Sequence, residues 1–229
     1  MECLVTKLNG VVSNKNLTPL GCIAFTASPS DNTLKLECNG NNVEYFTADG
    51  EAVFSTDKST LVNRIYANQT VFVKTNKPTL IFISNKYELT KVDIFDSAPN
   101  SQIDIDFNDF KYCKKVEEFN LAYYRTLTGD ISSLSSLTNL QAVNLSSTSV
   151  SGDISSFNRM IKLSILKMGT QGNGYFKALC NSLKNNGKTS GTLTFWAYNG
   201  QIKIDNQTDC PNNDVIATFS EGGISYSGL

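Results

Sequence analysis

Residues 127–145 read LTGDISSLSSLTNLQAVNL, and residues 150–168 repeat the same pattern as VSGDISSFNRMIKLSILKM. A more degenerate copy precedes them at residues 103–121, IDIDFNDFKYCKKVEEFNL. The copies begin at Ile103, Leu127 and Val150, so the interval between them is nearly constant. Units of this length are typical of repeat proteins, in which each unit buries its apolar side chains against its neighbours.

Seven apolar positions recur in the same order in each copy, and their spacing changes along the unit. In the second copy they are Leu127, Ile131, Leu134, Leu137, Leu140, Val143 and Leu145. The three-residue steps in the middle predict a 3₁₀-like or loosely helical segment. The two-residue step at the end predicts a strand in which Val143 and Leu145 point inward and Asn144 points outward.

The spacing L-x-x-L-x-L at the end of each unit resembles the strand signature of leucine-rich repeats. Leu127-Thr-Gly-Asp-Ile131-Ser and Val150-Ser-Gly-Asp-Ile154-Ser also resemble the L-[ST]-G-x-I-P element of plant-type leucine-rich repeats. Gly129 and Gly152 are then expected where the chain turns out of the strand and a side chain would clash.

The sequence departs from that family at two places. Serine stands where the family has proline, at Ser132 and Ser155. The turn position that usually holds a buried asparagine is occupied by Tyr124, Thr148 and Gln171. The resemblance therefore does not extend to a continuous ladder of asparagine side chains.

These units predict a mainly β fold, an α/β solenoid: a short leucine-rich-repeat solenoid of about five strands. Leu89-Thr-Lys-Val92-Asp-Ile94 fits the strand template upstream, and Leu193-Thr-Phe195 fits it downstream. Between the third copy and Leu193, residues 175–183 have helical spacing, and Asn185-Asn-Gly187 is expected to end that helix. An array this short needs a cap at each end.

We expect three parts: residues 1–21, a small antiparallel β domain over residues 22–86, and the solenoid with its C-terminal cap over residues 87–229. Short β-rich runs separated by turn residues predict the second part. Ile216–Phe219 and Ile224–Tyr226, joined through glycine, predict a β-hairpin cap. Residues 1–21 are either an edge strand of the β domain or an attachment arm that adds a strand to a partner through Leu4, Val5 and Leu8.

The composition argues against chemistry at a catalytic site. The chain has no histidine and six cysteines, none of them in a C-x-x-C pair, so the commonest general base and the usual zinc spacings are missing. Glu117 and Glu118 would point to opposite faces of a strand and cannot flank one bond. We expect no catalytic residue, no cofactor and no metal, and a protein that is not an enzyme. Cys113 is expected to be a buried free thiol, and pairing of Cys180 with Cys210 is left open.

Charge and hydropathy exclude two further classes of partner. Twenty basic residues balance 21 acidic ones without clustering, so the footprint of a nucleic-acid-binding surface is absent. No apolar run approaches the ~20 residues that span a bilayer. The opening residues also lack the pattern of a secretory signal.

The Met1–Gly21 opening and the general plan resemble structural and fibre proteins of crAss-like bacteriophages of Bacteroidetes. This resemblance implies a non-enzymatic virion structural protein (head fibre, capsid decoration or tail-associated protein), assembled in the host cytoplasm. It would attach to other virion or surface proteins, with a host glycan as a further ligand, and form a homo-oligomer, with a trimer favoured. The alternative is a bacterial leucine-rich-repeat adhesion or glycan-binding module at the cell surface. In both cases we expect the exposed strand positions to bind the partner: Asp93, Asn120, Asn144, Lys167 and Thr194.

Overall fold

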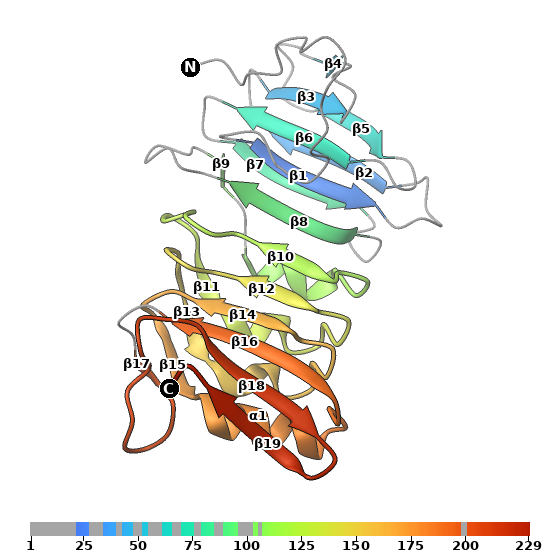
Figure 1. The fold of residues 1–229 in the computed structure, drawn as a ribbon. Coiled ribbons are helices and arrows are strands. Elements are labelled where there is room, and N and C mark those ends of the chain that lie inside the picture. Colours follow the sequence, from blue (N-terminus) through green and yellow to red (C-terminus); the bar gives the residue numbers. More distant parts are fainter. Residues whose placement is uncertain are drawn as a thin grey trace, which may run out of the picture.

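The computed structural model describes residues 107–197 and 201–229, together with the strands that lie between Cys22 and Asp104 (Figure 1). Of those earlier strands, side chains are described for residues 90–92. The fold is built mostly of strands, with a single α helix in the described part of the chain. The same part contains no helix that is both long and apolar enough to cross a membrane.

Eleven strands form one sheet, and five consecutive members of it are parallel. These five are β8 (Leu89–Phe95), β10 (Glu118–Asn120), β12 (Ala142–Asn144), β14 (Ile165–Met168) and β16 (Gly191–Ala197). The number of stacked strands agrees with the sequence. The antiparallel hairpin of β18 (Val215–Ser220) and β19 (Gly223–Ser227) continues the sheet beyond β16, as predicted for the C-terminal cap.

The other half of the sheet is antiparallel, and it begins at β8, which pairs with β10 on one side and with β1 on the other. Its strands are β1 (Cys22–Ala27), β6 (Thr70–Thr75), β3 (Val43–Thr47) and β4 (Ala52–Phe54). A separate sheet contains β5 (Leu61–Ile65), β2 (Leu34–Asn39), β7 (Thr79–Ser84) and β9 (Ile103–Asp104). The sequence predicted short β-rich runs over residues 22–86, and β1 to β7 lie within that range. Because the sheet passes through β8 without a break, the division between residues 86 and 87 stays a prediction.

The parallel strands pair in the register that the sequence repeat predicts. Phe119 lies opposite Val143, and Val143 lies opposite Leu166, so each residue pairs with the equivalent position of the next copy. Every repeated apolar position from Phe107 onward is buried, with no more than 3% of any of these residues exposed. The predicted inward orientation of Val143 and Leu145 is therefore confirmed.

The side of each unit opposite the parallel sheet is a 3₁₀ helix in the first three units, as the three-residue steps predicted. These helices are η2 (Phe107–Tyr112), η3 (Ile131–Leu134) and η4 (Ile154–Phe157). Asp130 and Asp153 cap η3 and η4 by accepting hydrogen bonds from the backbone N–H of Ser132 and Ser155, at 2.8 and 2.7 Å. The bond from Ser132 also lowers the pKa of Asp130. Proline has no N–H to donate, so serine at the family's proline position is what allows aspartate to act as the cap.

A second, smaller parallel sheet connects the two sides of the units. It consists of β11 (Thr128–Asp130), β13 (Ser149–Asp153), β15 (Gly172–Tyr175) and β17 (Gln201–Lys203). Gly129 and Gly152 lie in these strands with φ of 149° and 119°. A Cβ atom on Gly129 would lie 2.7 Å from Cβ of Phe107 in the preceding unit. The predicted clash is confirmed, and its cause is the close approach of successive units. The predicted turn out of a strand is wrong, because both glycines lie inside strands.

Thr148 makes two hydrogen bonds within the turn that follows β12. Its hydroxyl donates to the carbonyl of Leu145 at 2.7 Å and accepts from the N–H of Val150 at 3.4 Å. Tyr124, at the same position of the first unit, is buried, whereas Gln171 in the third is exposed. The three side chains differ in burial, so they do not form a uniform ladder.

The fourth unit has an α helix, α1 (Phe176–Asn185), in place of a 3₁₀ helix. It lies at the predicted position and packs Phe176, Leu179, Cys180 and Leu183 into the core. Gly187 follows it with φ of 107°, a conformation that suits glycine at a helix C-terminus. The helix lengthens the unit, and Leu166 consequently pairs with Phe195 and not with Leu193.

Candidate binding face

The parallel strands present one side to the core and the other side outward, and we call the outward side the outer face. Its described side chains include Lys91, Glu118, Asn120, Ala142, Asn144, Ile165, Lys167, Thr194 and Trp196, and Ile216 on the adjoining antiparallel strand β18 continues it. None of these residues is fully buried. In Figure 1 the strands that carry them run side by side across the sheet.

Strand register divides the outer face into two rows that cross the strands. One row passes through Lys91, Glu118, Ala142, Ile165, Thr194 and Ile216. The other passes through Asn120, Asn144, Lys167 and Trp196. Directly opposed residues in such a row have Cβ atoms about 4.5–5.5 Å apart, so each row is a continuous strip of neighbouring side chains.

Three of the predicted binding residues, Asn120, Asn144 and Lys167, lie together in the second row. Asp93 pairs with Asn120 in register, but its side chain lies outside the described residues. Thr194 also lies on the outer face, in the first row, where it pairs with Ile165. The prediction aligned Leu193-Thr-Phe195 with Leu166-Lys-Met168, two positions out of register, since the α helix lengthened the fourth unit.

Trp196 occupies the place that was assigned to Thr194, opposite Lys167. It is the single tryptophan of the chain, and it stands in the alternating run Leu193-Thr-Phe-Trp-Ala197, with Leu193, Phe195 and Ala197 buried. That alternation was the available signal. Extending the inward positions as far as Ala197 would have turned Trp196 outward.

Asn144 is half-buried rather than exposed, which corrects the prediction for this side chain. Its Oδ1 accepts hydrogen bonds from the backbone N–H of Ser146 at 3.2 Å and from the Ser146 hydroxyl at 2.7 Å. The amide oxygen therefore helps to fix the turn after β12 and is already occupied before any partner arrives.

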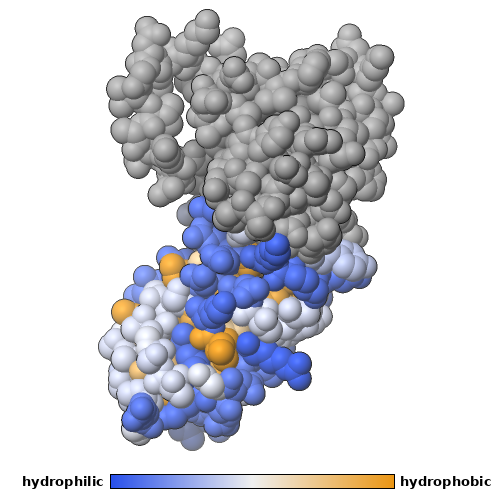
Figure 2. Space-filling model, turned by 90° about the vertical axis from the view of Figure 1, so that its right-hand side faces the viewer, coloured by the Kyte–Doolittle hydropathy of each residue, from blue (hydrophilic) through white to orange (hydrophobic). Residues whose placement is uncertain are grey.

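The centre of the outer face is apolar. Ile165 is 39% exposed, and Ala142 is its neighbour in the same row. Trp196 lies diagonally across the pairing from both Ile165 and Ile216, which is within reach of an aromatic ring. Figure 2 shows another side of the molecule, the right-hand side of Figure 1, where the described surface is largely hydrophilic with a small group of hydrophobic residues.

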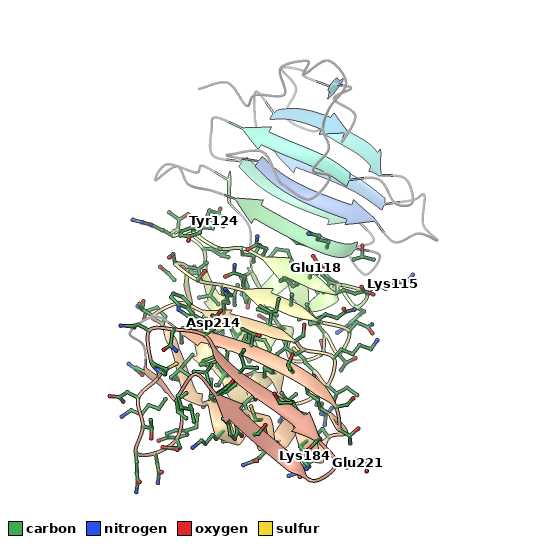
Figure 3. The ribbon with its side chains drawn as sticks, viewed as in Figure 1. Lys115, Glu118, Tyr124, Lys184, Asp214 and Glu221 are labelled. Carbon is green, nitrogen blue, oxygen red and sulfur yellow. The ribbon has the colours of Figure 1, made fainter. Side chains whose placement is uncertain are left out.

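Charged pairs flank this apolar centre. Nζ of Lys91 lies 2.8 Å from a carboxylate oxygen of Glu118, and Nζ of Lys167 lies 4.0 Å from a carboxylate oxygen of Asp214. Glu118 and Asp214 lie toward opposite ends of the strands (Figure 3). All four side chains are at least one-third exposed, so these pairs contribute little to folding stability and are accessible to a partner.

The described residues offer little to a catalytic or metal site. They contain no group of three or more histidine, cysteine, aspartate or glutamate side chains placed to hold a metal ion. Cys113 is a buried free thiol, as predicted, and Cys180 and Cys210, whose pairing the sequence left open, are also free. Burial raises the pKa of the Cys180 thiol to about 12, which suppresses the reactive thiolate. The predicted attachment residues Leu4, Val5 and Leu8 lie outside the described part of the chain.

Comparison with known proteins gives a partial similarity to a solved structure. No family model matches the chain, and no curated protein matches it in sequence. Among solved structures, it is similar to an internalin (inlF) from Listeria monocytogenes, with 22% sequence identity and a TM-score of 0.34. The similarity covers 44% of this chain and 28% of the internalin chain, so this chain spans less than a third of that protein.

Proposed function

We propose that residues 89–229 form a leucine-rich-repeat solenoid that binds a partner protein through its outer face and catalyses no reaction. The observation that carries this proposal is the position of Trp196, next to Ile165 and Ile216 on the outward side of the parallel strands. Trp196 is partly exposed to solvent on that side, where its ring can contact a partner.

The assignment to leucine-rich repeats is supported by the agreement of three independent features. The sequence period equals the strand register at successive units. The apolar positions of each unit are buried in one core cluster. A strand and a 3₁₀ helix alternate along the first three units. These are the properties of a solenoid, whose units are stable only when stacked.

A protein is the partner that suits this face best. An apolar centre with a charged rim is the usual anatomy of a protein interface, in which tryptophan often contributes most of the binding energy. Sugar rings also stack on aromatic side chains, but Ile165 and Ile216, diagonal to Trp196, are aliphatic, as is Ala142 next to Ile165. A glycan ligand is therefore the alternative that the experiment must separate.

The setting that we propose is a virion, in which the protein attaches to another structural protein. The support is the resemblance of Met1–Gly21 to the opening of crAss-like phage structural proteins, with Leu4, Val5 and Leu8 as its apolar attachment groups. A bacterial cell-surface module is the alternative setting. The outer face would serve the same binding role in both.

Replacing Trp196 with alanine is expected to weaken partner binding by roughly thirtyfold or more, which corresponds to about 2 kcal/mol. The probes are the proteins encoded beside this chain, co-expressed with it and then titrated against it in purified form by isothermal titration calorimetry, which measures wild type and variant alike. Tyr175→Ala is the matched control, because Tyr175 is 48% exposed but lies outside the outer face. Equal binding by Trp196→Ala and wild type would contradict the proposal, and binding only on a glycan array would favour the alternative.

Deleting residues 1–21 tests the proposed setting. If they form an attachment arm, the shortened chain is expected to keep its melting temperature and to lose co-sedimentation with assembled particles. Burial of three apolar side chains contributes roughly 1.5–3 kcal/mol each, which is enough for a multivalent attachment. If they form an edge strand instead, the melting temperature falls by several degrees, and the attachment arm is ruled out.

A further inference from the structure

The outermost strand of the sheet at its C-terminal end is β19, which pairs with β18 on one side only. Its hairpin turns through two residues, Glu221 and Gly222, so Ser220 and Gly223 form the closing hydrogen-bonded pair. In an antiparallel ladder such pairs alternate. The N–H and C=O groups of Ser225 therefore point toward β18, and those of Ile224 and Tyr226 point outward along the edge.

This edge has none of the usual features that prevent strands from pairing. Proteins protect an exposed edge with lysine, proline, a bulge or a covering loop. Gly223–Ser227 contains no charged residue and no proline, and its register with β18 is unbroken. Charged residues lie at the turn that precedes the strand, where Nζ of Lys184 donates to the carbonyl of Glu221 (Figure 3).

The core is also incompletely covered at this edge. Ile224 and Tyr226 pack against the core cluster but are only partly buried. The Tyr226 ring contacts Phe176, with ring centroids 6.2 Å apart. Lys177, whose Nζ lies 5.6 Å from the Tyr226 ring, forms an ion pair with Asp205 at 2.8 Å, so its charge is balanced. An additional strand beside β19 would complete the burial of both apolar side chains.

We propose that β19 pairs antiparallel with β19 of a second copy of the chain, with Ser225 opposite Ser225 of the second copy on a two-fold axis. In this register Ile224 lies opposite Tyr226 of the second copy, and Tyr226 opposite its Ile224. Both residues direct their backbone groups outward, so each pair is a hydrogen-bonded one. The two pairs also bring an aromatic and a β-branched side chain together on the core side, a favourable cross-strand combination.

A second copy suits this edge because the strand is complementary to itself. The pairing uses the same residues on both chains, as an isologous two-fold interface requires. It leaves no strand edge free at the joint, and the two copies form one continuous sheet. The predicted trimer could not be closed by this contact, since a two-fold interface joins only two chains. The inference does not depend on the partner of the outer face.

Light scattering after size exclusion tests the pairing on the full chain. The wild type is expected at about twice its chain mass of 25.1 kDa. Ser225→Lys places two ammonium groups opposite each other across the axis, and like charges in that position are destabilising. We expect Ser225→Lys and Ser225→Glu each to run as monomers, and an equal mixture of the two to recover the dimer. Recovery would show that both variants are folded.

Thr218→Lys is the matched control. Thr218 lies opposite Ser225 on β18 and is also exposed, but it is one strand away from the edge, so this variant is expected to remain a dimer. A wild-type chain that is monomeric or trimeric at micromolar concentrations would overturn the proposal. So would a dimer that Ser225→Lys leaves intact.

Disulfide formation tests the register itself. Ser225 faces its counterpart at a non-hydrogen-bonded site, where Cα atoms are about 4.5 Å apart, a distance that a disulfide can bridge. Mild oxidation is expected to cross-link Ser225→Cys into a covalent dimer, and to leave the wild type and Ser227→Cys uncross-linked. Cross-linking of Ser227→Cys in place of Ser225→Cys would contradict this register.

Discussion

Replacing Leu145 with alanine is expected to lower the free energy of unfolding by about 2–5 kcal/mol. Leu145 is fully buried in the middle of the core cluster, between the units that precede and follow it. The stacked units on either side hold the surrounding side chains in place, so the cavity left by the substitution cannot collapse. We therefore expect a loss of unfolding free energy toward the upper end of this range. Urea denaturation measures the loss as a lower midpoint at an unchanged slope.

Asn144→Ala is the neighbouring control for this measurement. Loss of its hydrogen bonds with Ser146 is expected to cost about 0.5–1.5 kcal/mol, less than the loss at Leu145. If Asn144→Ala destabilised the protein more than Leu145→Ala, the inward and outward assignments along β12 would have to be reversed.

Gly129→Ala is expected to be similarly damaging, although it adds one carbon instead of removing several. The new Cβ would lie 2.7 Å from Cβ of Phe107, an atom next to the backbone that cannot rotate away. Overpacking costs roughly 1–3 kcal/mol, and an alanine held in a sparsely populated backbone conformation costs roughly 1–3 kcal/mol more. At about 2–4 °C per kcal/mol for a chain of this size, the melting temperature falls by several degrees or more.

Gly222→Ala separates this effect from the general effect of replacing a glycine. Nothing lies within 4 Å of a Cβ at Gly222, and its φ is not in the left-handed region. Thermal melts should show little change for this variant. A Gly129→Ala protein that melted at the same temperature as Gly222→Ala would show that the units are less closely packed around Phe107.

The fold could be predicted where the spacing of the apolar residues corresponds to a single type of secondary structure. From Phe107 to Met168, the three-residue and two-residue steps distinguished the 3₁₀ helices from the strands, and the repeat length fixed the register. Three positions of the second row of the outer face followed directly, because strand alternation leaves Asn120, Asn144 and Lys167 on the side away from the core.

The prediction was wrong where the unit changed its length. An α helix and a 3₁₀ helix advance by different amounts per residue, so the register of β16 could not be extrapolated from the earlier units, and Trp196 was missed. The role of Thr148 could not be deduced either, since its hydroxyl is positioned by the turn and not by any repeated pattern. The pairing of β8 with both β1 and β10 could not be predicted, because pairing between distant segments leaves no pattern in the local sequence.

The double pairing of β8 has a consequence for the order in which the chain folds. On one side, β10 and β12 are joined by contacts that close short loops, such as Phe119 with Val143. On the other side, Cys22 must meet Phe95 across a far longer stretch of chain, which includes the whole of β2 to β7. Closing the longer loop costs more chain entropy, and non-local pairing is slow. We therefore expect folding to begin within the repeats and to proceed unit by unit until β8 pairs with β10. Only then does β1 pair with β8, whose position is already fixed.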